Sequence, residues 1–207
     1  MADHTQITTD TVSWLSCPEN FVVLSNWPTC GVHDDVWHLA ADPLFDIWYS
    51  TNIASHIFVS SSGTISFDTV KGTPYISTNG LPDGTSIPYA AVLHDPMSAI
   101  APESRLWYAA SATNYCMTWE NFYAGRQTNN PVTFQMEVLE NQDIIYRYLL
   151  SDSCVNSSVL TNFLIGVQAN CPDGGESLRF TATNATPKIF ELYWSCFGWL
   201  DPALEHH

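Results

Sequence analysis

Two glutamates in the middle of the chain have the residue type and placement that sugar hydrolysis requires. Glu120 and Glu137 lie on successive predicted strands, where side-chain alternation lets both face the same side of a sheet. A glycosidase uses two opposed carboxyl groups about 5 to 10 Å apart, one of them protonated at the working pH. These two residues are therefore the candidate catalytic pair. The same alternation also suits glutamates on the outer, solvated face of a sheet, and no serine-hydrolase elbow or zinc-protease motif accompanies them.

A second group of residues has ligand types that suit a divalent metal. His33, Asp34, Asp35 and His38 supply imidazole and carboxylate groups within one short segment. Their spacing matches no standard motif, and aspartates in such a loop also accept hydrogen bonds from their own backbone. Other acidic residues fall in predicted turns without an EF-hand pattern. We therefore expect no cofactor, with calcium as the alternative left open.

Aromatic residues are the third candidate group, because an exposed ring can stack on the face of a sugar. The tryptophans selected as candidate binding residues are Trp37, Trp48, Trp107 and Trp119. Aromatic side chains make up 13% of the chain, and a sandwich with few helices also needs rings to fill its core. Sugar binding and core packing are thus both open for these residues.

The cysteine content predicts an oxidising compartment. The chain has six cysteines and no CxxC pair: Cys17, Cys30, Cys116, Cys154, Cys171 and Cys196. We expect three disulfides, with Cys17 bonded to Cys30 and Cys154 bonded to Cys171 because each pair flanks a short segment. Buried thiols are the alternative.

The charge of the chain excludes several classes of partner. Six basic and 21 acidic residues give a formal charge of −15, which repels nucleic-acid phosphates and anionic lipid headgroups. No apolar run is long enough to cross a membrane. The partners that remain are a glycan, an extracellular protein or another copy of the chain.

The elements that would carry these candidates are predicted to be antiparallel strands. In 132–139, Val132, Phe134, Met136 and Val138 alternate with polar residues, which is typical of a sheet with one buried side. Around Trp119 a similar alternation sets Cys116, Thr118 and Glu120 on one face. The polar turn 140–143 then returns the chain through 144–150, so a hairpin is expected.

Further predicted strands and dense turn signals set the fold class. The strand predictions are 57–67 as a hairpin around Ser-Ser-Gly, then 89–93, 159–169, 178–182 and 189–194. No amphipathic helix of ten or more residues is evident. We predict an all-β fold, an antiparallel, disulfide-bonded β-sandwich with little helix, as a single domain over residues 1–203. Residues 204–207 have the sequence of a vector-derived tag remnant.

Several segments resemble a known family. WHLAADPLFDIWYSTNIASHIFVSSSGTISF, ISTNGLP, CMTWENF, PVTFQMEVLENQDIIYRY and FLIGVQAN occur in this order. Together they resemble nidogen-like β-sandwich domains of secreted and cell-surface bacterial proteins, over roughly residues 36–170. The departures from the pattern include His94-Asp95-Pro96, where the family often has a Trp-Asp-Asp-like segment, a richer cysteine set and two turn positions. Ser62 replaces the usual Asn before Gly63, and Gln142 stands in a turn where Gly is usual, so strain or widening is expected there.

The resemblance implies an accessory or adhesion module without catalytic residues. We therefore predict a secreted or cell-surface, non-catalytic interaction module that binds a glycan or a protein. The alternatives are an extracellular glycoside hydrolase using Glu120 and Glu137, and a structural subunit of a surface or filament assembly.

Overall fold

Antiparallel strands form nearly all of the regular structure in the described part of the chain, where residues 152 and 154 are helical. The computed structural model describes residues 6–8, 22–23, 37–39, 44–49, 52–54, 56–60, 62–67, 89–94, 104–123, 131–152, 154, 163–168, 175–180 and 189–194. Among them no helix is long and apolar enough to cross a membrane. The predicted all-β fold with little helix is confirmed for these residues.

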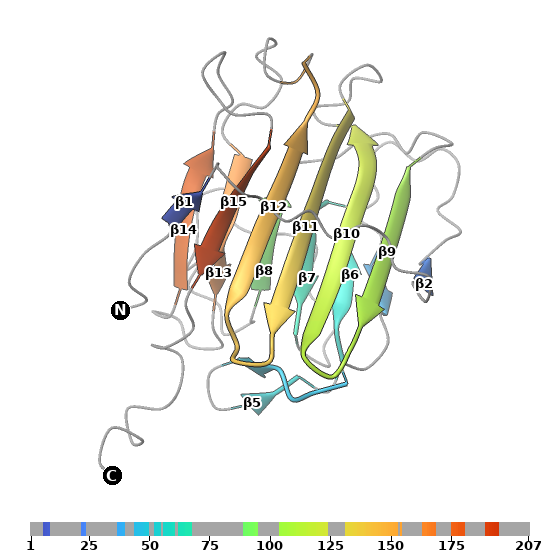
Figure 1. Cartoon of the computed structure of the whole chain (residues 1–207), viewed down its shortest axis with the longest axis vertical. Coiled ribbons are helices and arrows are strands. Elements are labelled where there is room, and N and C mark those ends of the chain that lie inside the picture. Colours follow the sequence, from blue (N-terminus) through green and yellow to red (C-terminus); the bar gives the residue numbers. More distant parts are fainter. Residues whose placement is uncertain are drawn as a thin grey trace.

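Two large sheets lie one behind the other (Figure 1). The seven-stranded sheet has the order β1 (Gln6–Thr8), β15 (Ile189–Trp194), β12 (Ile144–Leu150), β11 (Pro131–Leu139), β10 (Asn114–Tyr123), β9 (Arg105–Ala110) and β2 (Val22–Val23). The six-stranded sheet has the order β14 (Gly175–Phe180), β13 (Phe163–Gln168), β8 (Tyr89–His94), β7 (Thr64–Ser66), β6 (Phe58–Ser60) and β3 (Trp37–Leu39). A small pair, β4 (Trp48–Tyr49) and β5 (Asn52–Ile53), completes the described strands. All of the strand pairs are antiparallel.

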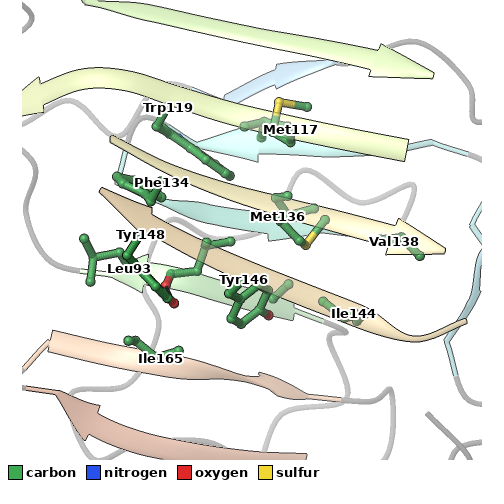
Figure 2. Packing of buried hydrophobic residues seen from close by; sticks show 14 of the residues in the cluster. Leu93, Met117, Trp119, Phe134, Met136, Val138, Ile144, Tyr146, Tyr148 and Ile165 are labelled. Atoms are coloured by element: carbon green, nitrogen blue, oxygen red, sulfur yellow. Dashed lines mark hydrogen bonds between the residues drawn. The ribbon is translucent and has the colours of Figure 1, made fainter. Parts of the chain in front are cut away.

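The core lies between the two large sheets, as a sandwich requires (Figure 2). Met117, Trp119 and Phe134 of the larger sheet face Ile65 and Leu93 of the smaller one within one buried cluster. The rings of Trp119 and Phe134 stack with their centroids 4.9 Å apart. The predicted alternation therefore places the expected residues on the core side.

Buried polar atoms of the core rings donate hydrogen bonds across the sandwich. Trp119 Nε1 donates to the carbonyl of Ser60 at 2.9 Å, and the Tyr148 hydroxyl donates to that of Val92 at 2.5 Å. Burial raises the pKa of Tyr148 well above its usual value, with a smaller contribution from Tyr146. These bonds satisfy polar groups that could not otherwise be buried without cost, and they fix how the two sheets lie against each other.

A β-bulge interrupts the predicted alternation in β10. Trp119 pairs with Phe134, but the next pair is Phe122 with Val132, so β10 carries one extra residue there. Asn121 has a φ of 54° and its N–H donates to Thr133 Oγ1 at 3.0 Å. Phe122 consequently faces the core, a shift that simple period-two counting does not anticipate.

The two turns at which the sequence departs from the nidogen-like pattern both use positive φ. Gly63 has a φ of +79°, and a Cβ there would lie 2.5 Å from the Leu93 carbonyl oxygen. Gln142 has a φ of 70° in the turn between β11 and β12, a conformation that normally favours glycine. The strain expected at Gln142 is thus present in the backbone.

The structure corrects the disulfide prediction at two of the six cysteines. Cys116 and Cys154 are both buried thiols, so the expected bond between Cys154 and Cys171 does not form. Cys154 belongs to the core cluster and its Sγ donates to the Pro131 carbonyl at 3.5 Å. Cys116 lies on the other face of the sheet, 3.8 Å from Thr118 Oγ1. The remaining cysteines, Cys17, Cys30, Cys171 and Cys196, lie outside the described residues.

Candidate functional site

Polar side chains form a buried row on the outer face of the seven-stranded sheet, opposite the core. The register aligns Thr118 with Gln135, Gln135 with Arg147, and Arg147 with Glu191 on four neighbouring strands. Thr118, Gln135 and Arg147 are all buried. The alternating pattern predicted a sheet with one buried side, and this prediction is wrong because both faces of the central strands are covered.

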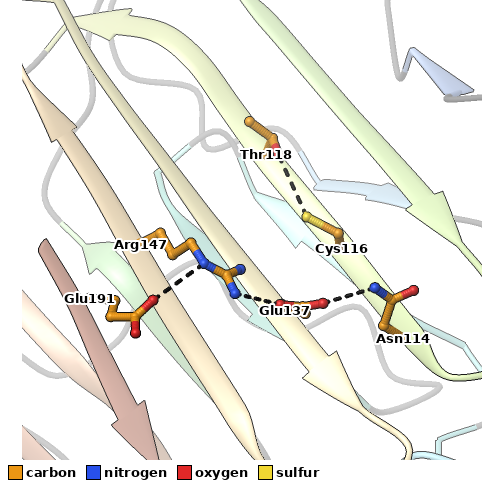
Figure 3. A network of polar contacts seen from close by, with 6 residues as sticks. All are labelled: Asn114, Cys116, Thr118, Glu137, Arg147 and Glu191. Carbon is orange, nitrogen blue, oxygen red and sulfur yellow. Dashed lines mark hydrogen bonds and ion pairs between the residues drawn. The ribbon is translucent and has the colours of Figure 1, made fainter. Parts of the chain in front are cut away.

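Glu137 lies within a chain of contacts that runs from Asn114 through Glu137 and Arg147 to Glu191 (Figure 3). Its Oε1 accepts a hydrogen bond from Asn114 Nδ2 at 2.8 Å, and its Oε2 accepts one from Arg147 Nη2 at 2.7 Å. Glu137 and Arg147 are each only 4% exposed. A carboxylate that is covered and bound at both oxygens is held as a structural anion.

Arg147 connects Glu137 to a second carboxylate. Its Nε lies 3.5 Å from Glu191 Oε2, an ion pair without hydrogen-bond geometry. Its Nη1 has no hydrogen-bond partner. The guanidinium therefore makes its strong, charge-assisted bond to Glu137, and the buried pair is nearly neutral as a unit.

The second proposed catalytic carboxylate, Glu120, lies far from Glu137 on the same face. Glu137 pairs with Cys116, and Glu120 is four residues farther along β10, where it pairs with Arg105. Because a strand advances about 3.4 Å per residue, the two positions are about 14 Å apart. That separation exceeds the range in which two carboxyl groups act on one glycosidic bond. The structure does not bring these two residues together as a catalytic pair.

Two of the four candidate tryptophans have no ring face available to a sugar. Trp119 is buried in the core, and Trp107 is buried on the outer face beside Thr118. The prediction that these two rings stack on a sugar is wrong, because stacking requires an exposed ring face. Trp37 and Trp48 lie in β3 and β4, but their side chains are outside the described part of the structure.

The proposed metal ligands fall mostly in the undescribed part of the chain. His33, Asp34 and Asp35 lie outside the described residues, as does the side chain of His38 in β3. Within the described ranges, no three metal-ligating side chains come together. The metal proposal for these four residues stays a prediction.

Comparison with known proteins identifies the family. A family model described as NIDO related matches residues 18–193. The chain belongs to the NIDO-related family. No curated protein and no solved structure gives a significant match. The match confirms the nidogen-like resemblance and extends it to β2, β14 and β15. Domains of this kind are generally extracellular.

The described surface of this NIDO-related domain exposes aliphatic side chains in two places. Leu149 and Ile189 pair directly across β12 and β15, beyond one end of the outer polar row. Leu44 and Ile53 belong to the segment that contains β4 and β5. These are the large apolar side chains that are exposed among the described residues.

Sequence reasoning missed the pairing of Glu137 with Arg147, although a signal for it was present. Arg147 is one of only six basic residues and stands in the apolar strand IIYRYLL. An arginine inside such a strand needs a buried acid, and residues on the same face of the neighbouring strand include Glu137. The cover over this face had no comparable signal in the strand patterns.

Proposed function

We propose that this NIDO-related domain is a secreted or cell-surface, non-catalytic module that binds other extracellular proteins. The family supports an extracellular interaction role in general. The choice of protein over glycan rests on one contrast. The described tryptophan rings are buried, whereas four aliphatic side chains, in two parts of the fold, are exposed. Aliphatic groups bury well against a protein surface but lack the flat ring that sugars favour.

The surroundings of Glu137 argue against the hydrolase alternative. Both of its oxygens accept a hydrogen bond and its side chain is covered, so a substrate could reach the carboxylate only by displacing these partners and the cover. Glu120 alone does not constitute the carboxylate pair that glycoside hydrolysis needs. In the proposed function, Glu137 therefore stabilises the fold and takes no part in catalysis.

A parallel binding screen tests the proposal. The purified chain is presented to a glycan array, with calcium and with chelator, and both retained protein and released sugar are measured. In parallel, the immobilised chain is exposed to surface and secreted proteins of the producing cell. Heat-denatured chain and a Leu44→Ser/Ile53→Ser/Leu149→Ser/Ile189→Ser variant serve as controls.

The expected result is saturable capture of a protein by the native chain, reduced in the variant, with no retention on glycans and no released sugar. Retention on a glycan that the variant preserves would replace the proposal with a sugar-binding role. Sugar release would instead revive the hydrolase. Capture of only further copies of the chain would favour a structural subunit.

A further inference from the structure

The segment around β4 and β5 closes one end of the sandwich. Figure 1 shows this hairpin lying across the end of the strands β10, β11 and β12. Ile47 and Ala54 are buried in the core cluster, and the Ala54 N–H donates to the Ile47 carbonyl at 2.8 Å. The inward side chains therefore anchor the segment by apolar contact.

A hydrogen-bonded tie fixes the same segment to the turn between β11 and β12. Gln142 Nε2 donates to the carbonyl oxygens of Asp46, at 3.0 Å, and Glu140, at 2.9 Å. One amide nitrogen thus holds the two backbones side by side. The Glu140 N–H also donates to the Thr113 carbonyl at 2.9 Å, which joins the turn between β9 and β10 to this end.

The positive φ of Gln142 is compensated by the hydrogen bonds that its side chain makes to Asp46 and Glu140. Glycine would adopt its φ of 70° without strain but could not reach Asp46. The side chain therefore provides what a glycine turn would lack, a fixed position for the segment.

Aliphatic and acidic side chains point outward from this fixed end. Leu44 is 67% exposed and Ile53 is 43% exposed. Asp46 and Glu140, the two residues held together by Gln142, are also exposed. We name Leu44, Asp46, Ile53 and Glu140 the hairpin-end surface. A rigid surface loses little conformational entropy on binding, which favours affinity.

We infer that the hairpin-end surface docks a segment of a partner protein in which aliphatic residues are flanked by lysine or arginine. This inference rests on the proposed function and names the partner chemistry. The aliphatic pair provides apolar area, and the exposed carboxylates select basic neighbours on the partner. The formal charge of −15 steers a basic segment toward the chain and repels an acidic one.

A selection experiment tests the surface and the chemistry together. A library of random linear peptides displayed on phage is selected on the intact wild-type chain. The enriched peptides are synthesised and their Kd values are measured on four proteins. These are the wild type, Leu44→Ser/Ile53→Ser, Asp46→Asn/Glu140→Gln, and the matched control Asp152→Asn, which changes an exposed carboxylate beyond the opposite end of β12. Thermal unfolding of each variant checks that the exposed substitutions leave the fold intact.

We expect enriched sequences with an excess of lysine, arginine and aliphatic residues. Their Kd should rise about tenfold or more on Leu44→Ser/Ile53→Ser and a few-fold on Asp46→Asn/Glu140→Gln. The matched control should leave Kd unchanged. Raising the salt from about 0.1 M to about 1 M, which shortens the Debye length from about 10 Å to about 3 Å, should remove the effect of the carboxylate substitutions.

Three results would overturn the inference. Enriched peptides that bind Leu44→Ser/Ile53→Ser as tightly as the wild type would place binding elsewhere and leave the proposed function intact. Acidic or neutral enriched sequences would contradict the partner chemistry alone. Failure to enrich any peptide while the chain still captures a native protein would exclude a linear basic segment, whereas failure of both experiments would overturn the proposed function too.

Discussion

The two faces of the seven-stranded sheet are both buried but are stabilised by different means. Its inner face, packed on the smaller sheet, consists of apolar and aromatic side chains, and Trp119, Tyr146 and Tyr148 among them donate to backbone carbonyls. Its outer face contains the buried Glu137–Arg147 ion pair, contacted by Asn114 and Glu191, and a row of buried polar side chains. An apolar core tolerates volume-conserving apolar swaps at a cost below about 1.5 kcal/mol, whereas removing one partner of a buried ion pair costs about 3–5 kcal/mol.

The difference bears directly on function. Ionisable groups collected on one face of a sheet suggest an active site when only the sequence is known. Here Glu137 and Arg147 are covered and paired, and the neighbouring positions Leu149 and Ile189 are exposed aliphatic residues. Chemistry-bearing residues can thus stabilise a domain, and the contact with partners is here proposed for exposed aliphatic residues instead.

The largest effect is expected from removing one charge of the outer network. Arg147→Met leaves the Glu137 carboxylate buried with only Asn114 as a donor, so the free energy of unfolding should fall by about 3–5 kcal/mol. The double variant Glu137→Gln/Arg147→Met should recover most of this loss because no charge remains uncompensated. Urea unfolding with m values measures both.

An exposed arginine on the same sheet provides the control. Arg105→Met, in β9, should change the free energy of unfolding by no more than about 0.5 kcal/mol. An equally small effect of Arg147→Met would mean that the outer face is solvated, and the contrast between the faces would disappear.

Alkaline pH should lower the free energy of unfolding through the tyrosines of the inner face. Burial raises the pKa of Tyr148 and of Tyr115 well above the usual value near 10, with a smaller effect of neighbouring ionisable groups. Below that pH these tyrosines keep their protons in both states, so their contribution is fully present. Above it the unfolded chain loses protons that the folded chain retains. Stability should fall by about 1.4 kcal/mol per pH unit for each tyrosine.

Urea unfolding at a series of pH values from neutral to alkaline tests this expectation. Burial also raises the pKa of the Cys154 thiol above 9.0, so the decline should begin near that pH. Tyr148→Phe should make the decline shallower above pH 10. A flat stability curve across this range would contradict the burial of these hydroxyls.

The two core tyrosines should differ at neutral pH because only one hydroxyl has an acceptor. Tyr148→Phe removes a donor to the buried Val92 carbonyl and should cost about 1–2 kcal/mol. The Tyr115 hydroxyl is buried and has no hydrogen-bond partner in the described structure, so Tyr115→Phe should be neutral or stabilising by up to about 1 kcal/mol. Thermal unfolding of the two variants provides a matched pair, and equal destabilisation would show that Tyr115 is also bonded.

The strand sequences were sufficient to predict most of the core and its hairpins. The predicted strands 132–139 and 144–150 correspond to β11 and β12 within one residue, because alternation with a buried face imposes a strict period. The bulge at Asn121 was not predictable in this way, since one extra residue leaves no compositional mark. The tie from Gln142 to Asp46 spans 96 residues of sequence, and no local pattern reports a contact of that range.

The candidate site was the least predictable part. Alternation correctly set Thr133, Gln135 and Glu137 apart from the core residues, but whether the face that they form is covered depends on parts of the chain remote from those strands. The burial of Trp107 and Trp119 was unpredictable for the same reason, because it depends on which elements cover each face of the sheet. A ring pattern in one strand does not tell which side of the sheet another element will cover.

Thiol labelling compares the two faces without altering either. Cys154 lies in the core and Cys116 on the outer face, and both are buried. An alkylating reagent should therefore modify neither thiol in the native protein, because the thiolate must be both formed and accessible. Unfolding without reductant should then expose two reactive thiols, with the other four cysteines unreactive if they are paired as an extracellular module requires. Rapid native labelling of Cys116 alone would show that the outer face is open, and would return Glu137 to consideration as an accessible carboxylate.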